Sequence, residues 1–316
     1  PQGRLTTFAG VPGEAGHRDG SATVALFQRP QGAAIDLERN LYVADTDNHV
    51  IRKVTPTGDT TTLAGVPQDS GEVDGPAATA KFSLPVGVTL FYDNSTEGGG
   101  RLTLFVADTN NHLIRRIREE PAAGSDDWYV ETWAGGGTAR ADGIGPAGLQ
   151  DGFRIEARFW TPRGVAVDAD GHLFVADTNN HVIRYIDPVG NVSILAGTPC
   201  IEGVQGFDDG TRLTATFTYP TDVSVGENNT VLVSDGHRIR RITRFDRPFS
   251  TIQGINSFDR VVTLAGNLPA GDKDGTGQEA TFDSPRGIMQ TPDRHIYIAD
   301  PVHCRIRRIT PAALVA

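Results

Sequence analysis

The sequence has no long hydrophobic run, few cysteines and little positive charge. No apolar stretch approaches the ~18 residues of a transmembrane helix, so we expect no direct insertion into a membrane. Two cysteines are too few for a disulfide scaffold or a cysteine-rich zinc site. The net charge is −10, from 29 basic against 39 acidic residues, which predicts no nucleic-acid partner because such a partner requires a basic surface. The N-terminal PQGRLTTFAG has no signal-peptide core, so we expect any targeting segment to be absent or removed.

Glycine, in contrast, is abundant, with 37 residues in a chain of 316, well above the average of roughly 7%. These glycines have no collagen-like three-residue period, so we attribute them to turns. Many turns in a folded chain imply many short elements, and that combination indicates an all-β protein.

One segment of the chain returns five times. LYVADTDNHVIRKV (41–54) is followed by LFVADTNNHLIRRI (104–117) and LFVADTNNHVIRYI (173–186), and by weaker copies in VLVSDGHRIRRI (231–242) and IYIADPVHCRIRRI (296–309). A second element, AG…DG…A.F..P.G, precedes each copy. Its Asp-Gly pairs begin at Asp19, Asp74, Asp151, Asp209 and Asp274, and a phenylalanine stands eight residues after each of these aspartates. Five copies with a fixed internal spacing identify a repeat protein.

Each repeat contains four strand-like runs joined by short turns. In the third repeat they are GVAVD (164–168), LFVAD (173–177), HVIRYI (181–186) and VSILAG (192–197). Four antiparallel strands repeated radially are typical of a β-propeller blade. The repeats predict blades at approximately 30–65, 85–135, 162–197, 220–266 and 285–310.

The two ends of the chain predict how the ring closes. The N-terminal LTTFAG (5–10) matches the fourth strands of the repeats, whereas the last repeat lacks a fourth strand. We therefore expect 5–10 to complete the last blade, because closure removes free sheet edges. The prediction is one closed, all-β propeller domain over 1–316 with five four-stranded blades. The alternative is six blades, which would require a hidden, degenerate blade.

The motif ADTNNHVIR, with AG…DG…F..P.G before it, resembles the NHL-repeat family of β-propellers. The resemblance covers nearly the whole chain. The fourth repeat departs from the pattern because DGHRIR is two residues shorter, and the fifth has Cys304 where the others have histidine. The resemblance implies six blades and, for most members, an interaction scaffold. The family also includes extracellular recognition modules, RNA- or protein-binding domains and a metal-containing, peptide-amidating lyase.

An aspartate and an arginine recur in every repeat, and we expect them at the end of the second strand and at the end of the third strand. The pairs are Asp45 and Arg52, Asp108 and Arg115, Asp177 and Arg184, Asp235 and Arg240, and Asp300 and Arg307. A hairpin folds each arginine back toward its aspartate. We favour an ion pair that stabilises each blade, because catalytic groups are asymmetric whereas these repeat in every blade. The alternative is a charged ring that binds an anion.

Histidines and loop aspartates are the candidate ligand-binding residues. They are His49, His112, His181 and His237 in the hairpins, and Asp142, Asp208 and Asp209 in the loops between blades. Equivalent positions in a propeller point in different directions, so we expect the histidines to pack between blades or to cap turns rather than to share one metal ion. The EF-hand spacing is absent from the acidic loops. We therefore predict no metal and no cofactor, with calcium or zinc as the alternative.

The remaining features concern the compartment. Cys200 and Cys304 fall in loops expected on the same face, where they are either a disulfide or two free thiols. Asn94, Asn191 and Asn228 begin N-x-S/T sequons in hairpins expected on the opposite face from the Asp-Gly loops. Glycans at these positions would leave the Asp-Gly face clear. The sequons and the acidic charge favour an extracellular or cell-surface glycoprotein.

No catalytic motif occurs in the sequence, which has no G-x-S-x-G, H-E-x-x-H or phosphate-binding loop. The first strands are mainly small and apolar, with Asp222 as the exception. We therefore expect a non-enzymatic binding scaffold that recognises a protein or a glycan through the face formed by the Asp-Gly loops. The alternative is a metal-dependent propeller lyase or hydrolase with its site at the central channel. The oligomeric state stays open.

Overall fold

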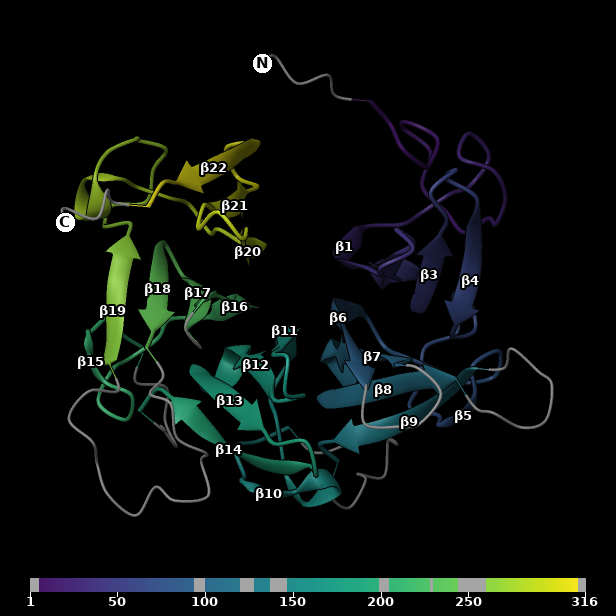
Figure 1. The fold of residues 1–316 in the computed structure, drawn as a ribbon, viewed down its shortest axis with the longest axis horizontal. Helices are drawn as coiled ribbons and strands as arrows, with labels where there is room; N and C mark the ends of the chain where they lie inside the picture. The colour runs from purple at the N-terminus through teal and green to yellow at the C-terminus, as the bar shows by residue number, and fades with distance from the viewer. Residues whose placement is uncertain are drawn as a thin grey trace. The chain divides into compact units, whose positions relative to one another are not determined.

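The computed structural model describes residues 6–93, 100–119, 128–136, 147–198, 205–227, 230–243 and 260–311, which form five antiparallel sheets (Figure 1). The chain is an all-β, five-blade β-propeller, and each sheet is one blade. It divides into two compact units, Pro1–Ala147 and Gly148–Ala316. The prediction of a single closed domain stays a prediction.

The first unit contains two blades. Blade 1 has the strand order β1-β2-β3-β4, with β1 (Pro30–Ile35), β2 (Leu41–Asp45), β3 (Val50–Val54) and β4 (Thr60–Ala64). Blade 2 has the order β5-β9-β8-β7-β6, with β5 (Gly75–Pro76), β6 (Pro85–Asp93), β7 (Arg101–Asp108), β8 (Leu113–Glu119) and β9 (Trp128–Ala134).

The second unit contains three blades. Blade 3 consists of β10 (Gly152–Phe153), β11 (Pro162–Val167), β12 (Leu173–Asp177), β13 (Val182–Ile186) and β14 (Asn191–Ala196). Blade 4 consists of β15 (Gly210–Thr211), β16 (Pro220–Val225), β17 (Val231–Asp235), β18 (Arg238–Ile242) and β19 (Arg260–Ala265). Blade 5 consists of β20 (Ile288–Gln290), β21 (Ile296–Asp300) and β22 (Arg305–Ile309).

The strand count per blade departs from the predicted four. The Asp-Gly segments add a two-residue strand outside the fourth strand of the blade that follows, as β5, β10 and β15. In blade 1 the same contact is a single bridge between Gly20 and Thr60. Blade 5 has three strands in the described part of the chain, and no strand is assigned over 6–9. Completion of blade 5 by the N-terminal segment therefore stays a prediction.

The apolar cores lie between adjacent blades of each unit. In the first unit, Ile51 of blade 1 belongs to one buried cluster with Phe82 and Leu104 of blade 2. In the second unit, Phe217 is buried in the cluster between blades 3 and 4, and Phe282 in that between blades 4 and 5. The repeated phenylalanine thus fills the space between blades. The middle strands β12 and β13 of blade 3 are buried along their whole length, which favours the valine- and isoleucine-rich runs of the repeat.

Short 3-10 turns connect the second and third strands of the first three blades. They are η1 (Thr46–Asn48), η2 (Thr109–Asn111) and η4 (Thr178–Asn180). Two more turns, η3 (Arg154–Glu156) and η7 (Gly277–Glu279), follow the Asp-Gly pairs. Among the described residues, no helix has the length and apolar character needed to cross a bilayer.

Candidate functional site

The repeated arginine of each blade is the centre of a buried hydrogen-bond network. In blade 3, Nη1 of Arg184 donates to Asp177 Oδ2 (3.1 Å) and to the carbonyl of Arg158 (2.8 Å). Nη2 of the same side chain donates to Asp151 Oδ1 (2.7 Å) and to the carbonyl of Gln150 (2.9 Å). One planar guanidinium therefore joins the hairpin to the Asp-Gly segment. We call this arrangement the arginine latch.

The other four blades contain the same latch. Each arginine bonds the aspartate of its hairpin and the aspartate of its Asp-Gly pair, as in Arg52 with Asp45 and Asp19, Arg115 with Asp108 and Asp74, Arg240 with Asp235 and Asp209, and Arg307 with Asp300 and Asp274. The repeated phenylalanine lies under each guanidinium, as in Arg184 over Phe159 at 5.0 Å. The arginine side chains of blades 1 to 4 are 0% exposed, so they cannot receive an anion from solvent.

Burial governs the ionisation of the hairpin aspartates. Loss of water raises the pKa of Asp108, Asp177 and Asp235 to about 6, and the arginine of each blade opposes this rise. Sequence reasoning missed another member of the network, the asparagine that precedes the histidine. Asn180 Nδ2 donates both to Asp177 Oδ2 (2.8 Å) and to the carbonyl of Gly148 (2.7 Å). Its signal was the repeated NNH triplet, which occurs in two hairpins and as DNH in a third.

The hairpin histidines bond the next blade. Nδ1 of His49 accepts from the backbone N–H of Leu84 (3.1 Å), and Nδ1 of His181 accepts from that of Tyr219 (3.2 Å). His237 and Ser284 repeat this contact at 3.3 Å. Burial lowers the pKa of His49, His112 and His181, which favours the neutral ring that this bond requires. Three of these rings, those of His49, His181 and His237, therefore connect successive repeats.

The backbone N–H that donates to each histidine lies in the two-residue segment between the repeated phenylalanine and proline. The residue before proline has a positive φ in every repeat, as in Arg29 (51°), Leu84 (50°), Thr161 (49°), Tyr219 (54°) and Ser284 (55°). In blades 1 to 4 the preceding residue donates its N–H to the hairpin aspartate, as Trp160 does to Asp177 Oδ1 at 2.7 Å. We call these residues the display positions: Gln28-Arg29, Ser83-Leu84, Trp160-Thr161, Thr218-Tyr219 and Asp283-Ser284.

Two exposed aromatic side chains stand at display positions of the second unit. Trp160 and Tyr219 are each 46% exposed. The ring of Tyr219 meets His181 edge-on, with centroids 4.6 Å apart, and its hydroxyl accepts from Gln205 Nε2 (3.1 Å). The carbonyl of Trp160 accepts from the N–H of Asn179, which lies in the same hairpin as His181. One hairpin therefore contacts both display positions.

The loop aspartates proposed as ligand-binding residues have structural partners. Asp209 Oδ1 accepts from Arg240 Nη2 (3.1 Å) and from Thr263 Oγ1 (2.8 Å). Asp208 donates its N–H to Thr216 Oγ1 (2.9 Å), and its carbonyl accepts from Arg240. Asp142 lies outside the described residues.

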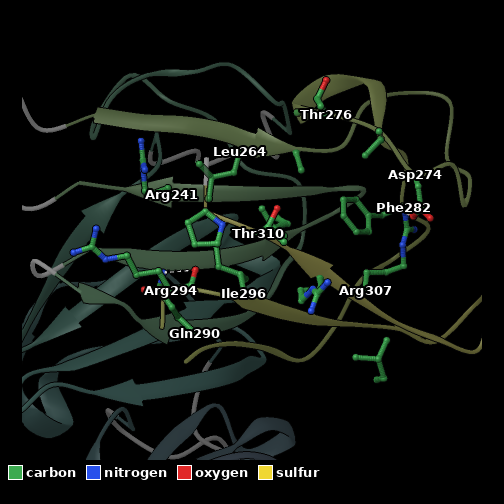
Figure 2. Close-up of a pocket in the computed structure, with 18 of the residues that line it drawn as sticks. Arg241, Leu264, Asp274, Thr276, Phe282, Gln290, Arg294, Ile296, Arg307 and Thr310 are labelled. Atoms are coloured by element: carbon green, nitrogen blue, oxygen red, sulfur yellow. Dashed lines mark hydrogen bonds and ion pairs between the residues drawn. The ribbon is translucent and has the colours of Figure 1, made fainter. Parts of the chain in front are cut away.

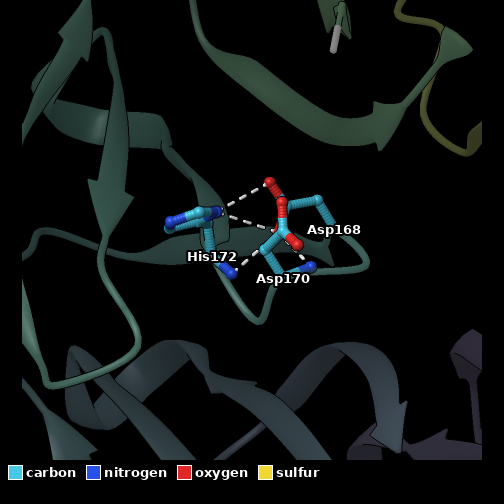
Figure 3. A group of neighbouring side chains, drawn as sticks. All are labelled: Asp168, Asp170 and His172. Atoms are coloured by element: carbon cyan, nitrogen blue, oxygen red, sulfur yellow. Dashed lines mark hydrogen bonds and ion pairs between the residues drawn. The ribbon is translucent and has the colours of Figure 1, made fainter. Parts of the chain in front are cut away.

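One group of side chains has the composition of a metal site, and Figure 3 shows it in the turn between β11 and β12. Ligand atoms of Asp168, Asp170 and His172 lie within 4.8 Å of one another. The Asp168 carboxylate, however, already accepts from the N–H of Asp170 (3.1 Å) and of His172 (2.9 Å). Asp36 and Asn40 make the equivalent turn in blade 1. The group is thus explained by the hydrogen bonding of the hairpin itself.

The residues proposed for covalent modification are only partly described. Cys304 is an exposed free thiol at a left-handed position (φ 52°), whereas Cys200 lies outside the described residues. Asn191 is exposed at the start of β14, and its Nδ2 donates to Asp187 Oδ2 (2.7 Å). Asn94 and Asn228 also lie outside the described residues.

Asp222 lies two residues after the repeated proline, at a position where the other repeats have glycine. Its Oδ2 accepts from the N–H of Ile288 in the first strand of blade 5 (2.9 Å), and burial raises its pKa to about 7. A Cβ on the equivalent Gly164 would lie 2.5 Å from Asp222 Cα, so glycine permits the close approach of blades 3 and 4.

Comparison with known proteins gives the following similarities. A family model described as "NHL repeat" matches residues 159–184. The chain is 26% identical over 310 residues to Protein SUPPRESSOR OF QUENCHING 1, chloroplastic, of Arabidopsis thaliana, covering 95% of this chain and 26% of that protein. It is 30% identical over 197 residues to NHL repeat-containing protein 2 of Homo sapiens, covering 59% and 24%. The chain thus spans about a quarter of the length of these relatives.

A solved structure of similar fold is an auxiliary nutrient binding protein from Bacteroides ovatus. It matches with a TM-score of 0.58 and 16% identity, covering 92% of this chain and 62% of that one. At this identity the match concerns the fold alone.

Proposed function

The chain belongs to the NHL-repeat β-propellers, and on this premise we propose that it is a non-enzymatic binding module. The proposed contact surface is the face that combines the Asp-Gly loops with the display positions. The observation that carries this proposal is that the side chains of each repeat fall into two groups with different roles. The repeated arginine, aspartate and histidine side chains bond the framework, whereas the side chains at the display positions differ in every blade.

A protein or a glycan is the proposed partner. Trp160 and Tyr219 are large, exposed and attached to a backbone that hydrogen bonds already fix. Tryptophan and tyrosine are enriched among the residues that dominate binding energy, and a fixed backbone lowers the entropy lost on binding. Asp222, the acidic exception among the first strands, bonds Ile288, which favours a structural role over the metal-dependent enzymatic alternative.

The test is a binding screen against a glycan array and an array of extracellular proteins. Replacing both Trp160 and Tyr219 with alanine should weaken a detected interaction at least about a hundredfold, as expected for two hot-spot residues. The matched control is Val189→Ala, since Val189 is also an exposed apolar residue but lies in the turn before β14. Equal binding by the double variant and the unaltered chain would contradict the proposal, and so would loss of binding in the control.

We also propose that the protein functions outside the cell or at its surface and carries a glycan on Asn191. The exposed position of this sequon at the end of a hairpin supports the proposal. Expression through the secretory pathway of a eukaryotic cell should give a chain whose mobility increases after glycosidase treatment. The Asn191→Gln variant should have a smaller mobility change than the unaltered chain. The same change in both would exclude Asn191 as an attachment site.

A further inference from the structure

The hairpin turns of blades 1 to 3 hold the first display position of their own blade. The second residue of each turn donates its backbone N–H to the carbonyl of that display position at 3.1 Å, as in Asp47 with Gln28, Asn110 with Ser83 and Asn179 with Trp160. This contact keeps the side chain of the second turn residue beside the side chains of the display positions.

In blades 1 and 2 that side chain has a partner at the display positions. Asp47 forms an ion pair with Arg29, with 2.6 Å between Oδ1 and Nη2. Asn110 Nδ2 donates to Ser83 Oγ at 2.9 Å. The polar groups of both turn residues are thus used by the framework.

Blade 3 has the same asparagine without this partner. Trp160 stands where blade 2 has Ser83, and an indole offers no acceptor to the Nδ2 hydrogens of Asn179. Within the described residues the side chain of Asn179 makes no hydrogen bond, and it is partly exposed. An amide donor and an amide acceptor therefore stay unused beside Trp160, which is itself 46% exposed.

The display position of blade 4 that contacts this hairpin is also neutral. The hydroxyl of Tyr219 accepts from Gln205 Nε2 at 3.1 Å, and its own hydrogen is not used in that bond. Burial lowers the pKa of His181, so the ring that Tyr219 meets edge-on is neutral as well. The side chains that one hairpin brings together here, including Trp160 and Asn179, carry no charge.

A cavity of the second unit has the opposite character (Figure 2). It has a volume of about 1120 Å³ and lies against β22 of blade 5. Arg241, Arg294, Asp274 and Arg307 are among the side chains that line it, and the last two belong to the arginine latch of blade 5. Charged groups that already bond the framework do not suit a neutral ligand, whereas the display positions around Asn179 do.

A sugar ring matches the chemistry of Trp160 and Asn179. Its faces present C–H bonds, whose positive hydrogens are attracted to the negative face of an aromatic ring. Its edge presents hydroxyl groups, which both donate and accept hydrogen bonds, as an amide does. An apolar protein surface over Asn179 would instead bury the amide without a partner, which is unfavourable for binding. The unused amide thus favours a glycan over a protein.

We propose that Trp160, Asn179 and Tyr219 form a subsite for a neutral glycan. One sugar ring stacks on Trp160 and bonds the Asn179 amide through its hydroxyls, and the adjoining sugar ring contacts Tyr219. This inference rests on the proposed binding function and names the class of its ligand.

The test compares two asparagines at the same position of the repeat. Binding of the full chain to a panel of uncharged oligosaccharides of glucose, mannose, galactose, xylose and N-acetylglucosamine is measured by isothermal titration calorimetry. Asn179→Ala should weaken the binding of a recognised oligosaccharide roughly tenfold, as expected when a hydrogen bond is lost and its partner is left unpaired. The matched control is Asn110→Ala, which breaks the bond to Ser83 and should leave the affinity unchanged. Trp160→Phe should bind more tightly than Trp160→Ala, because a phenyl ring still stacks.

The failure of this inference can be distinguished from the failure of the proposed function. A protein partner, or a charged glycan, that is lost in the Trp160→Ala, Tyr219→Ala double variant would uphold the proposed function and overturn the neutral glycan. The proposed function itself fails when the double variant binds every partner as the unaltered chain does.

Three results of the calorimetry would also overturn the inference. Binding to no oligosaccharide of the panel would exclude the ligand class. Equal affinities of the Asn179→Ala and Asn110→Ala variants, both shown by circular dichroism to be folded, would remove Asn179 from the subsite. Equal affinities of the Trp160→Phe and Trp160→Ala variants would exclude stacking on this ring.

Discussion

Replacing Arg184 with methionine should destabilise the protein by about 3–5 kcal/mol, the usual cost of breaking a buried ion pair. The change removes four hydrogen bonds, two to carboxylates and two to carbonyls. Bonds that involve a charged group contribute about 1.5–3 kcal/mol each but do not add fully, so the loss of two of the four already reaches this range. Methionine retains the apolar contact with Phe159, which limits the cavity that forms.

The pH dependence of this cost follows from Asp177. Burial raises its pKa and Arg184 opposes the rise, so removing the arginine raises the pKa further. The folded variant then keeps a proton on Asp177 that the unfolded chain releases near pH 4. The stability of the variant therefore falls as the pH rises from about 4 to the raised pKa of Asp177 in the folded variant. The cost of Arg184→Met should therefore be larger at pH 8 than at pH 5. Adding Asp177→Asn should recover about half of it, because no buried charge remains unpaired.

The assay is urea unfolding followed by circular dichroism, with Arg29→Met as the control. Arg29 also pairs with an aspartate, Asp47, at 2.6 Å, but its side chain is 57% exposed. Surface pairs contribute about 0–1 kcal/mol, so the control should unfold close to the unaltered chain. The latch interpretation would be refuted if Arg184→Met cost no more than Arg29→Met, or if its cost did not change with pH.

Three further predictions concern the contacts between blades. Gly164→Ala should destabilise the protein by about 1–3 kcal/mol, because its Cβ would lie 2.5 Å from atoms of Asp222. At Gly287 an added Cβ would lie 3.8 Å from its nearest neighbour, so Gly287→Ala should change the free energy of unfolding in urea by less than about 0.5 kcal/mol. The raised pKa of Asp222, about 7, means that its contribution to stability falls between pH 4 and 7 by at most about 1.4 kcal/mol per pH unit. Asp222→Asn should remove this contribution and reduce the slope in a pH series of thermal melts. The lowered pKa of His181 means that this residue costs stability as the pH falls below 6.5. His181→Gln, which keeps an acceptor for the Tyr219 N–H, should remove the share of His181 and so reduce the loss in the same melts.

The strands of the blades could be predicted from the sequence because the repeat supplies its own alignment. LFVAD (173–177) coincides with β12, and HVIRYI (181–186) begins one residue before β13. Five copies distinguish a strand pattern from chance in a way that one copy does not. The outer strand β10 was not predicted, because two residues carry no alternation of apolar and polar side chains.

The bond between the repeated arginine and the aspartate of the Asp-Gly pair could not be predicted either, and the reason is different. Asp151 and Arg184 are separated by 33 residues, and an Asp-Gly pair reads as an ordinary turn. Only the path of the chain past the outer edge of the blade brings that carboxylate to the guanidinium. The positive φ of Tyr219 was equally hidden, since the residue before a proline normally adopts an extended conformation.

Blade 4 departs from the repeat in its shortened hairpin, and polar residues of its first strand compensate for this with hydrogen bonds to blade 5. The hairpin of blade 4 is two residues shorter and lacks the threonine that donates to the proline of the next blade, as Thr178 does to the carbonyl of Pro220. Thr221 of the first strand donates to the carbonyl of Pro285 instead (3.0 Å). Its neighbour Asp222 accepts from the next blade in the same way.

The contact between blades 4 and 5 therefore keeps its hydroxyl donor although the hairpin that normally supplies the donor is shortened. A catalytic carboxylate would need a free oxygen lone pair and a partner group within reach of a substrate. Asp222 instead stands beside Thr221, and each bonds the first-strand segment of blade 5. Asp222, the acidic exception among the mainly apolar first strands, is thus accounted for by its hydrogen bond to blade 5.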